Sequence, residues 1–110
     1  MDIEFDTPAL RKICENEREA KRQLGAACAK KLKYRLAEIQ AASVVTELPA
    51  GNPHALGRER TDEYAVSLEG LKRLTFKPAN SPIPRTTDDK IDWSKVNKVN
   101  IVFIGNYHDY

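Results

Sequence analysis

The sequence has few of the residues and runs that mark exported or membrane-spanning proteins. It contains two cysteines in 110 residues, too few for a disulfide framework. Its longest apolar run, residues 99–105, is interrupted by Asn100 and is far shorter than the roughly 18–20 residues of a membrane span. Residues 1–6 are acidic and contain no apolar segment of a signal peptide. We therefore expect a soluble cytoplasmic protein with reduced thiols and no contact with a membrane.

Motifs of the common metal, nucleotide and serine-hydrolase sites are also missing. The two histidines, His54 and His108, belong to no HxxxH, CxxC or carboxylate group, so we expect neither a metal nor another cofactor. No GxGxxG, P-loop or GxSxG motif is present. Cys14 and Cys28 lie in stretches of helical periodicity without an activating motif, and we interpret both as core residues.

The length fits one domain, which we place at residues 1–110. The net charge of +2 conceals a strongly basic segment, because residues 18–35 carry seven lysines and arginines and one glutamate, a local charge of +6. Such a segment forms a solvated helix face or attracts a polyanion or an acidic protein. The charge alone does not decide between these two interpretations.

The hydrophobic pattern of the first half predicts a strand and two helices. Apolar and acidic residues alternate over residues 2–6, as in a short half-buried strand. Thr7 and Pro8 are typical of a helix start, and the helix is expected to end near Gly25. A second helix follows over about residues 26–42. The two helices should form an antiparallel hairpin.

The second half has the pattern of a small sheet. Residues 64–68 and 71–76 read as an antiparallel hairpin, which places Arg73 on the face opposite Leu74. Residues 79–92 contain prolines and other turn formers and predict a long surface loop. The apolar residues 99–104 predict an interior strand. We expect an α+β fold, with an N-terminal strand and a two-helix hairpin packed on a small, mostly antiparallel sheet.

Several polar residues lie within or just outside these strands. An exposed sheet face or a surface loop would account for each of them alone. If the strands pair, however, the residues converge on one face or one edge of the sheet. Arginines would then hold a phosphodiester and histidines would transfer protons, which is what a metal-free ribonuclease needs. The residues are His54, Arg58, Arg60, Arg73, Tyr107 and His108.

Three segments of the chain resemble the RelE/ParE superfamily of toxins from type II toxin–antitoxin systems. They are residues 56–66 (LGRERTDEYAV), 71–76 (LKRLTF) and 104–108 (IGNYH). Within the superfamily they are most similar to the HigB-like branch, the plasmid maintenance killer proteins, whose motifs run H-x-L-K-G-x-R, then W-R-(L/I)-x-F, then D-Y-H. The resemblance covers most of the chain, because the predicted order of strands and helices also fits that fold.

The resemblance implies a function and a set of partners. HigB-like toxins are ribosome-dependent mRNA endoribonucleases, or mRNA interferases, which inhibit translation without a metal. A helix-turn-helix antitoxin of the HigA kind neutralises them, and DNA is contacted only indirectly, through the antitoxin. By this resemblance the partners of the chain are the antitoxin, the ribosome and mRNA.

The resemblance also assigns roles to individual residues. Arg73 would hold the scissile phosphate, His54 and His108 would transfer protons, and Tyr107 would position or stack on the nucleotide. The basic helices and the loop before the first hairpin strand would contact RNA. The RNA-binding residues implied in this way are Lys30, Lys31, Lys33, Arg35, Arg58 and Arg60.

The chain departs from the HigB-like motifs at four places. Gly57-Arg58 stands where the family has Lys-Gly, and an arginine cannot lose a proton as a perturbed lysine can. Asp62 replaces a glycine, Lys72 a tryptophan and Asn106 an acidic residue. Two alternatives therefore stay open, namely a ParE-like gyrase inhibitor of the same fold and a catalytically weak repressor partner bound to its antitoxin.

Overall fold

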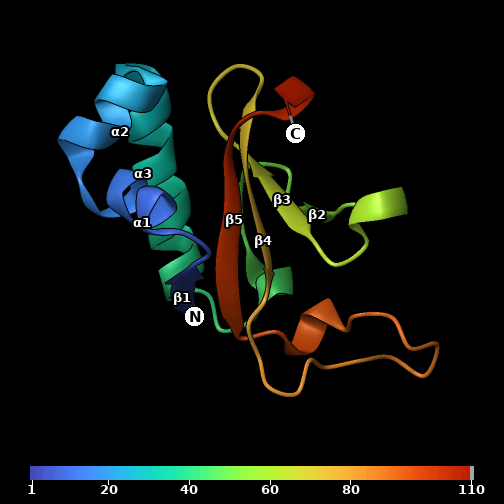
Figure 1. Cartoon of the computed structure of the whole chain (residues 1–110). Helices are drawn as coiled ribbons and strands as arrows, with labels where there is room; N and C mark the ends of the chain where they lie inside the picture. Colours follow the sequence, from blue (N-terminus) through green and yellow to red (C-terminus); the bar gives the residue numbers. More distant parts are fainter. Residues whose placement is uncertain (110) are drawn as a thin grey trace.

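Three helices cover one face of a five-stranded sheet in the computed structural model, which describes residues 1–109 (Figure 1). The helices are α1 (Pro8–Glu15), α2 (Glu17–Leu24) and α3 (Ala26–Ala41). The strands are β1 (Asp2–Phe5), β2 (His54–Ala55), β3 (Tyr64–Ser67), β4 (Lys72–Pro78) and β5 (Lys98–Asn106). Short 3₁₀ turns are η1 (Val45–Glu47), η2 (Arg58–Arg60), η3 (Trp93–Lys95) and η4 (Tyr107–Asp109). Within the described residues, no helix has the length and apolar character needed to cross a membrane.

The strand order is β1-β5-β4-β3-β2. The pairs β2–β3, β3–β4 and β4–β5 are antiparallel, and β1 runs parallel to β5. The predicted α+β class and mostly antiparallel sheet are therefore confirmed. Strand β5 lies inside the sheet, as its apolar run predicted, while β4 is the middle strand. The two-residue strand β2 was not predicted, because two residues are too few for an alternating pattern to stand out.

The predicted two-helix hairpin is wrong in one respect, because the first helix is interrupted at Asn16. This residue has extended backbone angles, ends α1, and begins α2 by accepting a hydrogen bond from the Glu19 backbone N–H through its side chain. Asparagine is one of the preferred residues before the first helical turn, because its side-chain oxygen accepts from a backbone N–H that the helix leaves without a partner. Thr7 does begin α1 as predicted, since its hydroxyl accepts from Leu10 N at 3.2 Å.

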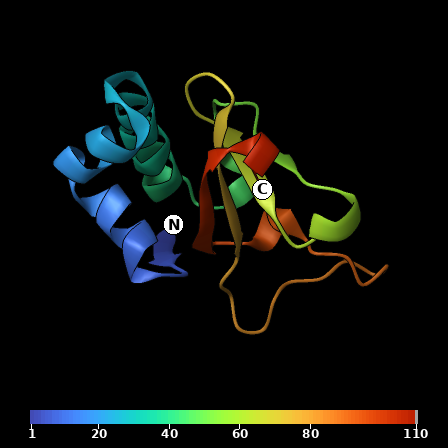
Figure 2. The same ribbon diagram turned by 45° about the horizontal axis from the view of Figure 1, so that its top comes forward.

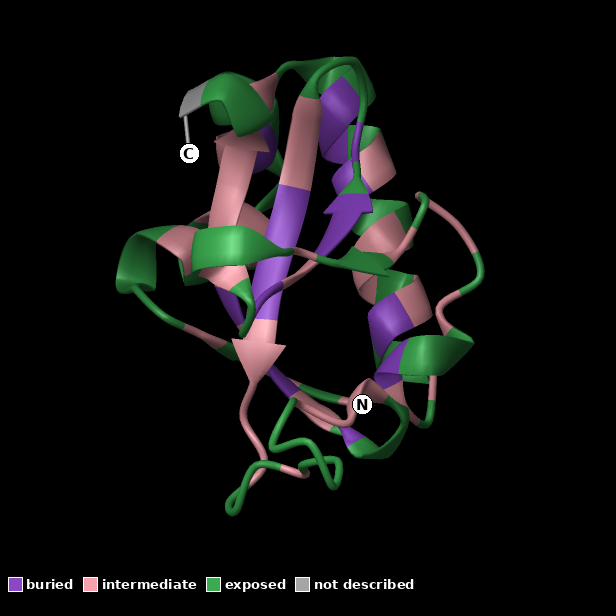
Figure 3. Cartoon of the chain, turned by 90° about the vertical axis from the view of Figure 1, so that its right-hand side faces the viewer, coloured by how far each residue is buried: buried purple, intermediate pink, exposed green. Residues whose placement is uncertain are grey.

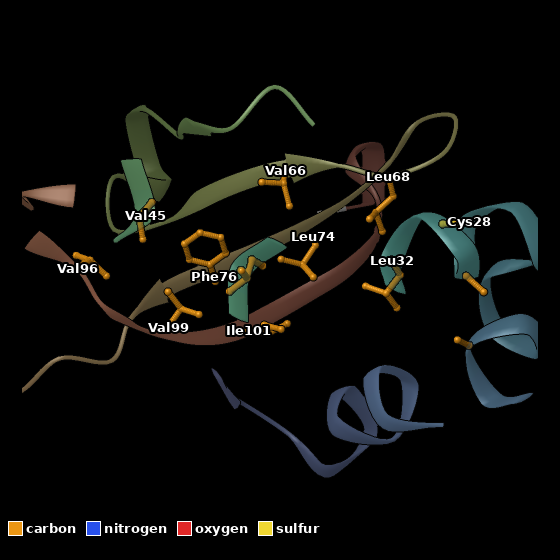
Figure 4. Close-up of a cluster of buried hydrophobic side chains, with 13 residues drawn as sticks. Cys28, Leu32, Val45, Val66, Leu68, Leu74, Phe76, Val96, Val99 and Ile101 are labelled. Atoms are coloured by element: carbon orange, nitrogen blue, oxygen red, sulfur yellow. The ribbon is translucent and has the colours of Figure 1, made fainter. Parts of the chain in front are cut away.

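The hydrophobic core lies between α3 and the sheet (Figure 4). Leu32 and Ile39 of α3 are buried, as the helical stripe predicted. They face buried side chains of the sheet, among them Leu74 and Phe76 of β4 and Ile101 of β5. Val45 of η1 and Val96, which precedes β5, belong to the same core. Because the core occupies one face of β4, only the opposite face of this strand can carry the side chains of a functional site.

The two faces of β4 differ as the alternating pattern predicted. Leu74 and Phe76 face the helices, whereas Arg73 and Thr75 lie on the opposite face, which we call the outer face. The register with β5 shifts between Thr75 and Phe76, a β-bulge. The middle of β4 is buried on both faces (Figure 3), which means that the outer face is covered near Thr75. Arg73 is half-buried and lies near the first residue of β4.

Arg35 links α3 to the sheet instead of facing solvent with the neighbouring lysines. Its side chain is only 11% exposed, donates from Nε to the carbonyl oxygen of Ser67 at 3.0 Å and pairs with Glu38 at 2.9 Å. Ser67 N in turn donates to the carbonyl oxygen of Gly51 at 2.7 Å. These contacts hold the segment before β2 against α3. They give Arg35 a structural role that differs from the predicted contact with RNA.

We expect Gly51→Ala to destabilise the chain more than Gly25→Ala does. Both glycines have φ of +85°, a backbone conformation that costs an alanine roughly 1–2 kcal/mol. A Cβ at Gly51 would lie 2.5 Å from Arg35 Nε, whereas a Cβ at Gly25 would meet nothing within 4 Å. The excess loss at Gly51 should be about 1 kcal/mol, the contribution of the displaced hydrogen bond. Urea unfolding measures it, and equal losses for the two variants would contradict the role given to Arg35.

Candidate active site

Arg73 is the central residue of the candidate site, and its position follows from the pairing of β4. It lies opposite Ser67 of β3 and Gly105 of β5, on the outer face. Gly105 has no side chain, and the Phe103 ring lies over it, 3.1 Å from the position that a Cβ would take. The Nε atom of Arg73 is buried and has no hydrogen-bond partner within the described chain. A buried donor without a partner costs free energy, and an arginine is suited to bind a phosphate with several N–H groups.

Tyr107 and His108 are brought to Arg73 by the turn η4, which follows β5. The backbone N–H of Tyr107 donates to the carbonyl oxygen of Leu71 at 3.1 Å, so η4 lies across the end of β4 (Figure 2). The Arg73 guanidinium carbon is 5.4 Å from the centre of the Tyr107 ring, a cation–π contact. The centres of the Tyr107 and His108 rings are 4.1 Å apart. The three side chains therefore form one continuous stack.

The His108 backbone is held independently of its ring. Its N–H donates to the Asn106 side-chain oxygen at 2.9 Å. Asn106 is the last residue of β5, so this hydrogen bond holds the start of the turn. Asn106 thus supplies a side-chain acceptor for the turn. The His108 side chain itself is exposed. The ring is therefore accessible to a ligand.

His54 lies on the same face but apart from this stack. It is paired with Ala65 of β3, and Ala65 is paired with Thr75 of β4, so His54 shares the outer face with Arg73. Along the strand direction, His54 is level with Thr75, which is two residues and about 7 Å from Arg73. Across the sheet, β2 lies two strands from β4, a distance of about 10 Å. The structure therefore places Arg73, Tyr107 and His108 together and His54 across the outer face from them.

The environment of His54 defines which of its nitrogens is available. Nδ1 lies 2.7 Å from the carbonyl oxygen of Asn52. Because a carbonyl oxygen only accepts, Nδ1 carries the hydrogen and Nε2 of the neutral ring is left as an acceptor. The ring is exposed, so Nε2 is accessible to a ligand. His54 is thereby prepared to take a proton.

The predicted RNA-binding residues fall into two groups in the structure. Arg58 and Arg60 lie in η2, between β2 and β3, where Arg58 has φ of +58° and is exposed. Lys30 and Lys33 are exposed on α3 and Lys31 is half-buried there. The first half of α3 and the turn η4 lie toward the same end of the molecule, on opposite sides of the sheet (Figure 1).

The sequence interpretation missed Glu63, a buried acidic residue near the candidate site. Its side chain accepts a hydrogen bond from the Thr75 hydroxyl at 3.0 Å and lies 3.7 Å from Arg60 Nη1. No sequence motif marks this residue, because an acidic residue ahead of a strand usually belongs to an exposed turn.

Among residues 1–109, no group of three or more His, Cys, Asp or Glu side chains is arranged to hold a metal ion.

We expect Cys14→Ser to leave any activity of the chain unchanged. Burial, with the nearby Glu15 carboxylate as a smaller cause, raises the pKa of the Cys14 thiol from 9.0 to about 12. The thiol is therefore protonated at neutral pH and is a poor nucleophile. Cys28 is buried in the core. Iodoacetamide at pH 7.5 should label Cys14 only after unfolding, and rapid labelling of the folded chain would contradict the assignment.

Comparison with known proteins is limited to the fold. No protein-family model and no curated protein matches the sequence. Among solved structures, the chain is similar to the YoeB dimer from Staphylococcus aureus, with a TM-score of 0.59 over 97% of each chain and 16% sequence identity. At this identity the likeness concerns the fold and not the chemistry. The chain has the α+β fold of that YoeB structure.

Proposed function

We propose that the chain is the toxin of a type II toxin–antitoxin system and acts as a metal-independent mRNA endoribonuclease. The observation that carries the proposal is the buried, unpartnered Nε of Arg73, held next to Tyr107 and His108. A buried guanidinium nitrogen without a partner is suited to bind an anion such as a phosphate. The two histidines on the outer face supply groups that accept and donate protons.

The proposed reaction is an internal transesterification of RNA. Nε2 of His54 accepts the proton of the 2′-hydroxyl, and the 2′-oxygen forms a bond to the adjacent phosphorus. The bond from phosphorus to the 5′-oxygen breaks, and His108 donates a proton to this leaving oxygen. Arg73 binds the phosphate oxygens, whose negative charge grows in the transition state. The products are a 2′,3′-cyclic phosphate and a 5′-hydroxyl end.

Tyr107 has two roles in this proposal. Its ring holds the Arg73 guanidinium by the cation–π contact, and its exposed part is available to position the nucleotide by contact with a base. The separation of His54 from the stack fits a substrate that spans the outer face. The proposal includes a shorter distance between His54 and the Arg73 stack when RNA is bound, because catalytic contacts often tighten only with substrate.

The fold supports the superfamily part of the proposal, since YoeB is a RelE/ParE-superfamily type II toxin. The finer assignment to the HigB-like branch rests on residues 56–66, 71–76 and 104–108. With that branch come a HigA-like antitoxin, cytoplasmic action on ribosome-bound mRNA, and contacts of Arg58, Arg60 and the lysines of α3 with RNA. The same assignment makes contact with DNA indirect, through the antitoxin.

The experiment that tests the proposal is cleavage of mRNA on programmed ribosomes. Purified chain is incubated with ribosomes carrying a defined mRNA, and the RNA ends are read by primer extension beside a ribosome-free sample. The proposal expects cleavage in the presence of ribosomes, with 5′-hydroxyl ends. Absence of cleavage by the folded chain, in both samples, would overturn it and favour a gyrase inhibitor or a repressor partner. A DNA supercoiling assay distinguishes these two.

A further inference from the structure

One buried carboxylate holds the arginine-bearing loop between β2 and β3, residues 56–63. Glu63 is 4% exposed and Thr75 is fully buried, and these are the two buried polar side chains of the described chain. They are hydrogen-bonded to each other, from the Thr75 hydroxyl to Glu63 Oε1 at 3.0 Å. The second carboxylate oxygen, Oε2, lies 3.7 Å from Arg60 Nη1. The carboxylate therefore connects the loop with the middle strand.

The backbone of Glu63 closes the same loop at its base. Its carbonyl oxygen accepts from Leu56 N at 2.9 Å, and its N–H donates to the Arg60 carbonyl oxygen at 3.1 Å. Arg60 N donates to the Gly57 carbonyl oxygen at 3.2 Å within the turn η2. Residues 57–62 thus project from a base that Glu63 defines. Arg58, in this projecting part, has no such anchor of its own.

A purely structural role does not account for a charged residue at this position. Burying a carboxylate costs free energy, and an apolar side chain of similar size usually fills such a place at no cost. Thr75 lies on the outer face, two residues from Arg73, so the buried charge sits between the loop arginines and the candidate phosphate-binding residue. Buried ion pairs are known in some proteins to fix one arrangement of the neighbouring groups.

We propose that Glu63 is a positioning residue, which fixes Arg60 and the loop of residues 56–63 over the outer face so that the loop binds RNA beside Arg73. The inference rests on the proposed function. Glu63 does not touch the substrate in this scheme. It acts through the guanidinium of Arg60, which remains 39% exposed while it is paired.

The test is Glu63→Gln, with Glu4→Gln as the matched control. The glutamine oxygen still accepts from Thr75 but has no charge to hold Arg60. Glu4→Gln makes the same chemical change in β1, at the opposite edge of the sheet, where the exposed carboxylate pairs with Lys98 at 3.6 Å. In single-turnover cleavage of ribosome-bound mRNA, Glu63→Gln should raise the half-saturating concentration about tenfold and change the maximal rate less than about threefold. Glu4→Gln should change neither by more than about twofold.

A second measurement follows the loop itself and does not need activity. Trypsin cleavage after Arg58 and Arg60, identified by mass spectrometry, should be several-fold faster in Glu63→Gln than in Glu4→Gln, with cleavage after the exposed Lys90 as the internal reference. Thr75→Val, which removes the hydrogen bond to the carboxylate, should act in the same direction and replaces Glu63→Gln if that variant does not fold.

The outcomes separate this inference from the proposed function. If the unmodified chain cleaves mRNA but Glu63→Gln lowers only the maximal rate, the positioning role is overturned. Unchanged tryptic cleavage after Arg58 and Arg60 in the folded variants overturns it as well. If the unmodified chain cleaves no mRNA, the proposed function fails and the role of Glu63 in RNA binding fails with it. Faster tryptic cleavage after Arg58 and Arg60 in Glu63→Gln would then establish only that Glu63 holds the loop in place.

Discussion

Replacing Arg73 with alanine should lower the rate of mRNA cleavage by at least about a hundredfold, the usual effect of removing a group that stabilises charge in a transition state. The fold should be kept, because the Nε atom has no hydrogen bond to lose and the cation–π contact with Tyr107 contributes only about 0.5–2 kcal/mol. The thermal unfolding midpoint should therefore fall by a few degrees at most. Cleavage of ribosome-bound mRNA, measured with circular dichroism melts of the same preparation, checks both expectations.

Two further arginine variants sharpen this prediction. Arg73→Lys keeps the charge but not the planar set of donors, so its cleavage rate should fall between those of the unmodified chain and Arg73→Ala. Arg85→Ala removes an arginine of the 79–92 loop, which is exposed and pairs only locally with Asp89. It should cleave like the unmodified chain. An Arg73→Ala variant that keeps full activity would remove the basis of the proposed function.

Replacing His108 with alanine should lower cleavage by about a hundredfold to ten-thousandfold, the range found for general acid–base catalysts. The ring is exposed and the backbone of η4 is held by Asn106 and Leu71, so the turn should keep its conformation. The expected loss therefore reports on proton transfer and not on folding. Primer extension on programmed ribosomes measures it.

The direction of proton transfer can be tested with a modified mRNA. When sulfur replaces the leaving 5′-oxygen at the cleavage position, the leaving group departs as a thiolate and needs no proton. Such an mRNA should restore cleavage by His108→Ala, which lacks the acid, but not by His54→Ala, which lacks the base. Restoration in His54→Ala alone would reverse the two roles. Restoration in neither variant would mean that His108 is not the acid.

Much of the fold was predictable because the relevant signals are local. Thr7 and Pro8 predicted the start of α1, and the alternation around Leu74 predicted both faces of β4. The break at Asn16 was missed although its signal is local too, since the apolar stripe continues across it and outweighs the capping pattern. Strand β2 was missed for a different reason. Its pairing with β3 depends on contacts that no two-residue pattern reveals.

The candidate site was predictable only in part, because strand pairing decides which residues meet. The grouping of Arg73 with Tyr107 and His108 follows from the β4–β5 hairpin and η4. The distance to His54 depends on the sheet order, which the residues do not reveal. Arg35 and Glu63 show a further limit, since a charged side chain reads as exposed until its tertiary partners are known.

The place of β5 in the sheet bears on when the chain becomes able to act. Strand β5 is made after the four other strands, yet it lies between the first strand, β1, and the middle strand, β4. Neither neighbour has its full set of ladder hydrogen bonds until residues 98–106 leave the ribosome that makes them. Such long-range pairing delays folding to a late stage. The emerging chain therefore has neither a complete sheet nor the Arg73 stack until residues 98–108 have been made.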